Sequence, residues 1–388
     1  MQTRNVAAAL LSLLLLTSCA ATPRANEGPA TTGETDSDRV AGEWVELPES
    51  PLSARQGVSA QVVGTRFVLI GGSTDLACPP TASCVPSLTG YRSDGAVYDP
   101  DTRTWQRIAE APVPVSFFST AAIDDSLYLL GAADLTTGDD VFLRYDLGAE
   151  EWQPLPDPPT TGSSIIATDT QILAIAGTNE FGPTEDAFFS PTTGAWTPLP
   201  PDPLGDSFNR SAVWLGDRLL LSGQQLIDNP GAEAPSLTRM AELNADLTTW
   251  TLLSDSPIIG GSPLAVGDDV IFPERGSADG GEVGNWGRFY DLGGIWNAST
   301  GEWKTLPAGR PDPAQHGLWT SARGAVSSNL ALLDDSLLNL SERTWSRIPE
   351  PPRGTRLGQT VVVGEGAVLV WGGTDGAQNV ADGAILYL

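Results

Sequence analysis

The stretch Trp303-Lys-Thr-Leu306-Pro307 decides the fold, because near-copies of it occur seven times along the 388-residue chain. Each copy opens with tryptophan, has Leu or Ile three residues later and, in five copies, ends in proline. The tryptophans are separated by 61, 47, 44, 54, 53 and 42 residues. Repeats of this length indicate a propeller rather than a string of independent domains. The seven tryptophans are Trp44, Trp105, Trp152, Trp196, Trp250, Trp303 and Trp345.

A large apolar residue precedes each tryptophan by seven positions, from the second copy onward. A small polar residue follows it directly, and such a side chain starts a turn by accepting hydrogen bonds from nearby backbone amides. The pattern predicts a strand, a polar turn and a strand that begins with tryptophan. The apolar residues are Tyr98, Tyr145, Phe189, Leu243, Trp296 and Leu338.

Glycine ends a second kind of strand upstream of these turns. Phe67-Val-Leu-Ile-Gly71-Gly72 and Val368-Leu-Val-Trp-Gly372-Gly373 are the clear copies, and weaker ones end at Gly131, Gly177 and Gly223. Glycine in this place allows neighbouring backbones to approach closely. The fifth repeat has Phe272-Pro273 instead, and the sixth lacks the glycine.

A glycine-ended strand, an aromatic strand and Trp-x-x-Leu-Pro together resemble the kelch repeat, over residues 43–388. The resemblance implies an all-β, seven-bladed kelch-type β-propeller. After Trp345 three strands are expected, at Gln359–Val363, Ala367–Trp371 and Ala384–Tyr387, with Tyr387 in the place of Tyr98. The missing fourth strand is available at Trp44–Leu47, so the N- and C-terminal strands should pair and close the ring.

The N-terminus has the pattern of an export signal. Arg4 precedes an apolar run from Val6 to Leu16, and Leu16-Thr-Ser-Cys19 resembles the lipobox of bacterial lipoproteins. Residues 1–18 are therefore expected to be a lipoprotein signal peptide, and Cys19 to be lipidated. Residues 19–42 would form a flexible tether that holds the propeller on the extracytoplasmic side of the cell membrane. The alternative is an ordinary signal with a chance cysteine.

Charge and cysteine content narrow the ligand classes. The net charge of −27 argues against nucleic acid, which requires a basic surface. Cys78 and Cys84 are expected to form a local disulfide in an exported protein. Two thiolates with no nearby histidine rarely hold zinc, so no metal site and no cofactor are expected. A monomer is expected.

Long insertions fall between the second and third strands of three predicted blades, at 73–95, 224–240 and 274–294. In a four-stranded blade these loops emerge on one face, which suggests recognition there; free drift of loop length is the alternative. The blade-five insertion is unusual, because Glu274 and Arg275 are followed by the aromatic residues Trp286 and Tyr290. These aromatics either bind a sugar or protein, or fold back onto the blade.

Arginines are expected on the same face, where the innermost strands begin. Arg55, Arg210 and Arg356 occupy such positions, as kelch-type repeats often have, and His316 occupies the sixth. Around the channel mouth, guanidinium groups would suit a carboxylate or phosphate. The alternative is that they pair with acidic neighbours or carbonyl groups between blades.

These observations favour a membrane-anchored, extracytoplasmic propeller that binds a glycan or an envelope protein through its long-loop face. The alternative is a cofactor-free carbohydrate-active enzyme, such as a sugar-acid mutarotase, with Glu274, Arg275 and His316 as candidate residues. Such an enzyme should show a pocket with a perturbed carboxylate beside an arginine. Galactose-oxidase-like copper chemistry requires two histidines, and the chain has one. A scaffold in a lipoprotein complex would instead show a broad apolar patch.

Overall fold

A computed structural model describes residues 42–76, 90–116, 118–132, 140–227, 235–259, 261–272, 293–311 and 322–388, and the backbone of 275–277 and 289–291. The described residues form strands, bridges and turns, and no helix. None of them therefore forms a helix of the length and apolarity needed to cross a membrane. The predicted signal peptide, the expected lipidation site Cys19 and the predicted tether up to residue 41 lie outside these ranges.

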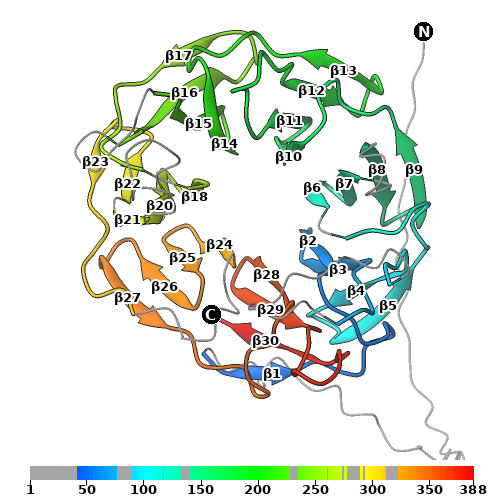
Figure 1. The fold of residues 1–388 in the computed structure, drawn as a ribbon. Helices are drawn as coiled ribbons and strands as arrows, with labels where there is room; N and C mark the ends of the chain where they lie inside the picture. Colours follow the sequence, from blue (N-terminus) through cyan, green and yellow to red (C-terminus); the bar gives the residue numbers. More distant parts are fainter. Residues whose placement is uncertain are drawn as a thin grey trace, which may run out of the picture. The chain divides into compact units, whose positions relative to one another are not determined.

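Seven four-stranded antiparallel sheets stand around a central axis as the blades of a β-propeller (Figure 1). Blade 1 contains β2 (Ser59–Val63), β3 (Arg66–Ile70), β4 (Gly95–Asp99) and β5 (Thr104–Ile108). Blade 2 contains β6 (Ser119–Ile123), β7 (Ser126–Ala132), β8 (Asp140–Asp146) and β9 (Glu151–Leu155). Blade 3 contains β10 (Ser163–Ala167), β11 (Ile172–Ala176), β12 (Ala187–Ser190) and β13 (Ala195–Pro198). Blade 4 contains β14 (Ser207–Trp214), β15 (Arg218–Gln225), β16 (Thr238–Asn244) and β17 (Trp250–Leu252).

The remaining blades are less regular. Blade 5 contains β18 (Leu264–Val266), β19 (Asp269–Phe272), β22 (Gly294–Asn297) and β23 (Trp303–Lys304), and it carries an added hairpin of β20 (Arg275–Ser277) and β21 (Phe289–Asp291). Blade 6 contains β24 (Arg323–Ser327), β25 (Leu330–Leu333), β26 (Ser336–Asn339) and β27 (Thr344–Arg347). Blade 7 contains β28 (Thr360–Gly364), β29 (Ala367–Trp371), β30 (Gly383–Tyr387) and β1 (Trp44–Glu46).

The two ends of the propeller meet in blade 7, which confirms the predicted closure. The N-terminal strand β1 pairs with the C-terminal strand β30, and the two lie side by side at the rim in Figure 1. Trp44 stands opposite Leu386. The prediction that Tyr387 takes the place of Tyr98 is therefore wrong by one residue, because the blade-7 register is set by this pairing.

The seven-residue spacing in the sequence is a cross-strand contact in the structure. The outermost strand of each blade begins at or next to its tryptophan, which stands opposite the apolar residue of the third strand. Tyr98 and Trp105 are one such pair, with ring centroids 5.0 Å apart. The polar residue between the strands makes the expected turn: Asp99 accepts hydrogen bonds from the amides of Asp101 and Thr102.

Six of the seven repeat tryptophans also join their blade to the preceding one. The Trp105 indole donates a hydrogen bond to the Pro48 carbonyl of blade 7, and six of the seven tryptophans make the equivalent bond, at 2.7–3.1 Å. The acceptor always lies four residues past the neighbouring tryptophan. The exception is Trp303, whose indole nitrogen is buried and has no acceptor among the described residues. Its neighbouring repeat has Ser254 where five other repeats have proline.

Glycine pairs end the second strands of blades 1 and 7 where neighbouring chain segments come closest. Gly71 and Gly372 both have positive φ, of 72° and 71°. A β-carbon at Gly71 would overlap the carbonyl oxygen of Val115, which lies in the connection to blade 2. At Gly372 it would come within 2.7 Å of the Arg55 carbonyl oxygen. The predicted role of these glycines is confirmed.

The apolar core lies between the blades. The cluster that includes Val68, Ile70, Leu127 and Leu129 joins blades 1 and 2. A second cluster, which includes Leu52 and Trp371, joins blades 1 and 7. Each blade is thus stabilised mainly by burial against its neighbours.

Candidate functional site

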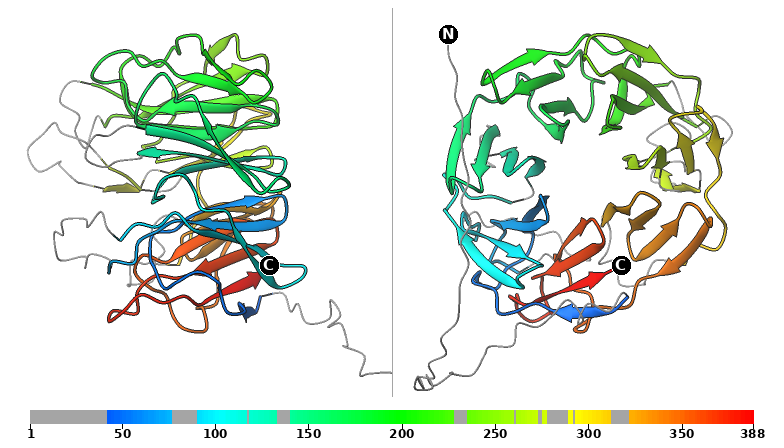
Figure 2. Two further views of the ribbon diagram at one scale, coloured as in Figure 1. Left: turned by 90° about the vertical axis from the view of Figure 1, so that its right-hand side faces the viewer. Right: turned by 180° about the vertical axis from the view of Figure 1, so that it is seen from behind.

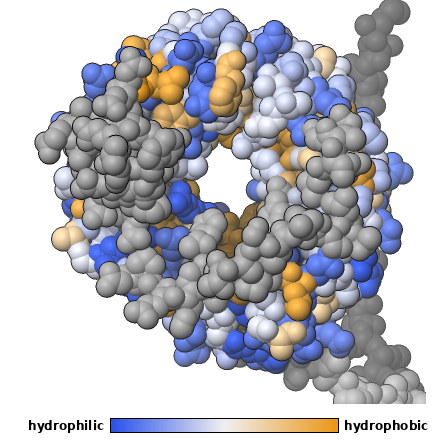
Figure 3. All heavy atoms as spheres, viewed as in Figure 1, coloured by the Kyte–Doolittle hydropathy of each residue, from blue (hydrophilic) through white to orange (hydrophobic). Residues whose placement is uncertain are grey.

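The two faces of the propeller differ in their connections. The turns between first and second strands, and between third and fourth strands, have two to five residues and lie on one face. The connections between second and third strands lie on the other, which we call the long-loop face. The blade-5 hairpin β20–β21 belongs to this face and stands out to the side of the ring in Figure 2. Figure 3 shows the same face and the open passage through the centre.

The predicted insertions differ from the structure in detail. In blade 4, β15 runs to Gln225 and β16 starts at Thr238, so the loop is shorter than the predicted 224–240. In blade 5, the predicted loop 274–294 contains the hairpin, in which Gly276 stands opposite Tyr290. A ladder of backbone hydrogen bonds forms there because the insertion is long enough to fold back on itself.

Exposed apolar side chains gather on the second-to-third connections. Four large hydrophobic side chains are notably exposed among the described residues, and three lie on this face: Leu76 in blade 1, Phe181 in blade 3 and Leu226 in blade 4. Phe181 is 91% exposed. The fourth, Leu252, lies on the outer strand β17. The elaborated face therefore also offers apolar contacts.

Two of the predicted arginines are buried in ion pairs. Arg55 is 1% exposed and bonds both carboxylate oxygens of Asp94, at 2.5 and 3.0 Å, and the Gly71 carbonyl. Arg210 contacts Asp186 of the preceding blade at 2.6 Å and Asp202 at 3.1 Å. These bonds connect the end of a second strand to the residue that precedes the third strand. They agree with the alternative prediction that the arginines pair with acidic neighbours or carbonyl groups. Ligand binding by Arg55 and Arg210 stays a prediction.

The two carboxylates differ in environment. The hydrogen bond from Arg55 holds the pKa of Asp94 below its usual 3.8, against the opposing effect of burial. Burial raises the pKa of Asp186, although Arg210 and the Ala176 amide oppose this. Asp186 is thus a perturbed carboxylate beside an arginine, but it does not line either pocket described below.

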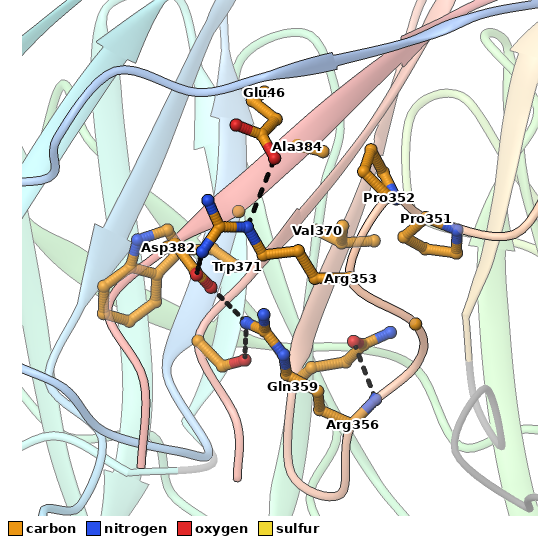
Figure 4. Close-up of a pocket in the computed structure, with 13 residues that line it drawn as sticks. Glu46, Pro351, Pro352, Arg353, Arg356, Gln359, Val370, Trp371, Asp382 and Ala384 are labelled. Atoms are coloured by element: carbon orange, nitrogen blue, oxygen red, sulfur yellow. Dashed lines mark hydrogen bonds and ion pairs between the residues drawn. The ribbon is translucent and has the colours of Figure 1, made fainter. Parts of the chain in front are cut away.

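Arg356, the third predicted arginine, lies in a different setting in blade 7. Its guanidinium bonds the Asp382 carboxylate and the Gly372 carbonyl. Asp382 also accepts a hydrogen bond from Arg353 at 2.7 Å, and Arg353 in turn bonds Glu46 of β1 at 3.2 Å. Figure 4 shows the Arg353 guanidinium between these two carboxylates. Strands from both ends of the propeller therefore build this cluster.

Two adjoining cavities share Arg353, Arg356 and Asp382 in their walls. The inner pocket is small, with a cavity volume of about 20 Å³, and is also lined by Glu46, Gln359 and Trp371, among others. The outer depression has a volume of about 580 Å³ and opens along the β29–β30 loop on the long-loop face. We call the two together the blade-7 site.

Most of the other predicted site residues lie outside the described residues: Glu274, Trp286, His316, Cys78 and Cys84. Arg275 and Tyr290 are placed by their backbone alone, in the β20–β21 hairpin. Their roles stay predictions. Among the described residues, no three of His, Cys, Asp and Glu gather closely enough to hold a metal ion.

The sequence interpretation missed several polar residues that matter in the structure. At the entry to blade 6, Arg310 bonds Asp334 at 2.9 Å and its Cζ lies 5.2 Å from the centre of the Trp345 ring. In blade 7, Arg353, Gln359 and Trp371 line the inner pocket. The available signal was that an aspartate directly precedes the third strand in blades 1, 3, 6 and 7.

A scan against protein-family models and a search of curated proteins found no match to this chain. The assignment of a β-propeller architecture therefore rests on the structure and not on a relative.

Proposed function

We propose that this protein is a membrane-anchored, extracytoplasmic kelch-type propeller that recognises an envelope protein or glycan through its long-loop face. The observation that carries this proposal is the difference between the two faces. One has only short turns, whereas the other combines long connections with exposed Leu76, Phe181 and Leu226. Loops that carry exposed apolar side chains on a rigid scaffold are a common form of binding surface.

The kelch assignment is supported by the repeat motifs and by the contacts that they make between blades. Anchoring is supported by the apolar run and Leu16-Thr-Ser-Cys19. Lipidation at Cys19 predicts that labelled palmitate enters the wild-type chain and not Cys19→Ala. Labelling of that variant would contradict the proposed anchor.

A protein partner is favoured over a glycan, because the aliphatic side chains of Leu76 and Leu226 suit an apolar interface better than a sugar ring. A photo-crosslinking residue at position 181 or 226, in the native envelope, should capture the partner. The same residue at position 252, on β17, is the control. Capture from position 252 to the same extent as from positions 181 and 226 would contradict the proposal.

The purified partner then provides a quantitative test. Burial of a phenylalanine side chain contributes about 1.5–3 kcal/mol, so Phe181→Ser should weaken binding about tenfold or more. Leu252→Ser should leave the affinity unchanged. If a soluble glycan rather than a protein competes with the captured partner, the ligand class is carbohydrate. Equal affinities for both variants would refute recognition through this face.

A further inference from the structure

Phe181 lies in a turn that is bonded firmly to the neighbouring blade. The Gly182 amide donates to the Asn179 carbonyl at 3.1 Å and closes the turn. The Asn179 side chain accepts a hydrogen bond from the Ser207 amide at 2.7 Å and donates one to the Gly205 carbonyl at 3.2 Å. The Phe181 ring is nevertheless 91% exposed. A turn that is already ordered loses little conformational freedom when it binds, so this ring is well placed for recognition.

Leu226 belongs to the adjacent loop of blade 4 and is joined to the same connection between blades 3 and 4. Its amide donates to the Asp206 carbonyl at 3.1 Å, and the next residue, Ser207, pairs with Gln225. Blades 3 and 4 lie side by side in Figure 1. Leu226 is 51% exposed. The loops that carry Phe181 and Leu226 are therefore held together through residues 206 and 207.

Three carboxylates on these loops form no hydrogen bond or ion pair with any described residue. They belong to Glu180, Glu185 and Asp206; the last two are exposed and Glu180 is half-buried. We call these three residues, together with Phe181 and Leu226, the blade 3–4 patch. Apolar side chains and uncompensated negative charge occur together in this patch.

The arginines at this end of blades 3 and 4 do not neutralise the patch. Arg210 is 0% exposed and is already paired with two aspartates. Arg239, at the start of β16, lies 3.9 Å from the Asp255 carboxylate. The loops themselves contain neither lysine nor arginine in their described parts, which are 177–186, 199–206, 225–227 and 235–237.

The exposed leucine of blade 1 has different surroundings. Leu76 lies two residues from Thr74, whose hydroxyl accepts a hydrogen bond from the exposed Arg92 at 2.9 Å. Arg107 of the same blade is 59% exposed, and its ion pair with Asp94 is 3.6 Å long. This part of the long-loop face therefore carries accessible positive charge, in contrast to the blade 3–4 patch.

We propose that the partner docks on the blade 3–4 patch through a cationic amphipathic segment, in which lysine or arginine lies beside apolar side chains. Phe181 and Leu226 contact the apolar side chains of the segment, and the three carboxylates pair with its cations. Complementary charge of this kind orients a partner and speeds its association. A surface of anionic lipid, by contrast, would be repelled by the patch. This inference rests on the proposed recognition through the long-loop face and specifies the chemistry of the partner.

The test uses three synthetic peptides that share the same apolar residues and have lysine, glutamine or glutamate at the intervening positions. Binding to the purified protein is followed by fluorescence anisotropy at physiological ionic strength. The lysine peptide should bind most tightly and the glutamate peptide should not bind. Salt at about 1 M, where the Debye length is about 3 Å, should weaken binding of the lysine peptide. Phe181→Ser should weaken it about tenfold or more, because an apolar contact is lost.

The charge variants locate the attraction on the surface. Glu180→Gln and Asp206→Asn should each weaken binding of the lysine peptide about two- to fivefold, as expected for the loss of one partly exposed ion pair. Asp246→Asn is the matched control, because it removes the same charge from the exposed β16–β17 turn on the opposite face of blade 4. That variant should leave the affinity unchanged.

Absence of binding by the lysine peptide, or equal binding of the lysine and glutamine peptides, would overturn the inference. Weakening by Asp246→Asn to the same extent as by Asp206→Asn would also overturn it, because the attraction would then come from the net charge of −27 as a whole. If crosslinking at position 181 or 226 still captures a partner, recognition through the long-loop face stands and only the cationic segment is refuted. Equal capture from position 252 refutes the proposed function itself.

Discussion

The hydrogen bonds between indole and carbonyl groups around the rim lead to a prediction about two matched tryptophans. Trp196 donates to the Pro156 carbonyl at 2.7 Å, whereas the buried indole nitrogen of Trp303 has no acceptor among the described residues. Both rings lie 5.4 Å from a phenylalanine, Phe189 and Phe272. Replacement of each tryptophan by phenylalanine keeps an aromatic ring beside this neighbour, and only the Trp196 replacement breaks a hydrogen bond.

Trp196→Phe should lose about 0.5–1.5 kcal/mol from the broken bond, in addition to the shared loss of area. Trp303→Phe removes a buried N–H donor that has lost its hydrogen bond to water and gained none in the protein. Its removal should raise the free energy of unfolding by about 1–3 kcal/mol. The free energy of unfolding of Trp303→Phe should therefore exceed that of Trp196→Phe by about 1.5–4.5 kcal/mol. Equilibrium unfolding in urea, followed by circular dichroism, measures this difference. Equal destabilisation of the two variants would refute the reasoning.

Two further predictions concern the blade-1 and blade-3 connections. Gly71→Ala should lower the thermal unfolding temperature much more than Gly162→Ala. Both glycines have positive φ, but only Gly71 faces a neighbouring backbone. Similar decreases in the unfolding temperature would show that φ alone determines the effect. Because the pKa of Asp94 is lowered on folding, its ion pair with Arg55 stabilises the protein above pH 3.8, and this contribution is lost as the pH falls through the folded-state pKa. The difference in free energy of unfolding between the wild type and Asp94→Asn should therefore become smaller as the pH falls toward 3. A difference that does not change with pH would contradict this.

The sequence was sufficient for the architecture because the repeat encodes contacts directly. The seven-residue spacing between Tyr98 and Trp105 is the length of a tight antiparallel hairpin, and the same spacing recurs in five more blades. Closure followed from counting strands at the two ends. The error at Tyr387 arose where this spacing could not be applied, since β1 and β30 are far apart in sequence and their register depends on tertiary pairing.

The site was harder to predict because pairing partners are distant in sequence. Arg55, Arg210 and Arg356 were found from their position at the entry to inner strands, but the position does not show whether a guanidinium is free. Asp94 and Asp186 lie 39 and 24 residues from their arginines. The guanidinium groups of Arg55 and Arg210 form ion pairs with these aspartates. Only the three-dimensional structure shows that the Arg356 Nε has no acceptor among the described residues.

Departures from the repeat are more informative about function than the repeat itself. Residues that recur in every blade, such as the tryptophans, are explained by contacts between blades. Gln359 and Trp371 bring buried polar groups to positions where blade 1 has apolar side chains, at a cost to stability that packing does not repay. The two side chains lie on opposite faces of the blade-7 sheet, as their blade-1 equivalents Val58 and Ile70 do, so a single ligand would not supply acceptors to both. The unpaired Trp303 indole lines neither described pocket, and the absence of proline at position 254 does not explain it, because the Trp152 indole bonds the carbonyl of Ala109 at the equivalent position.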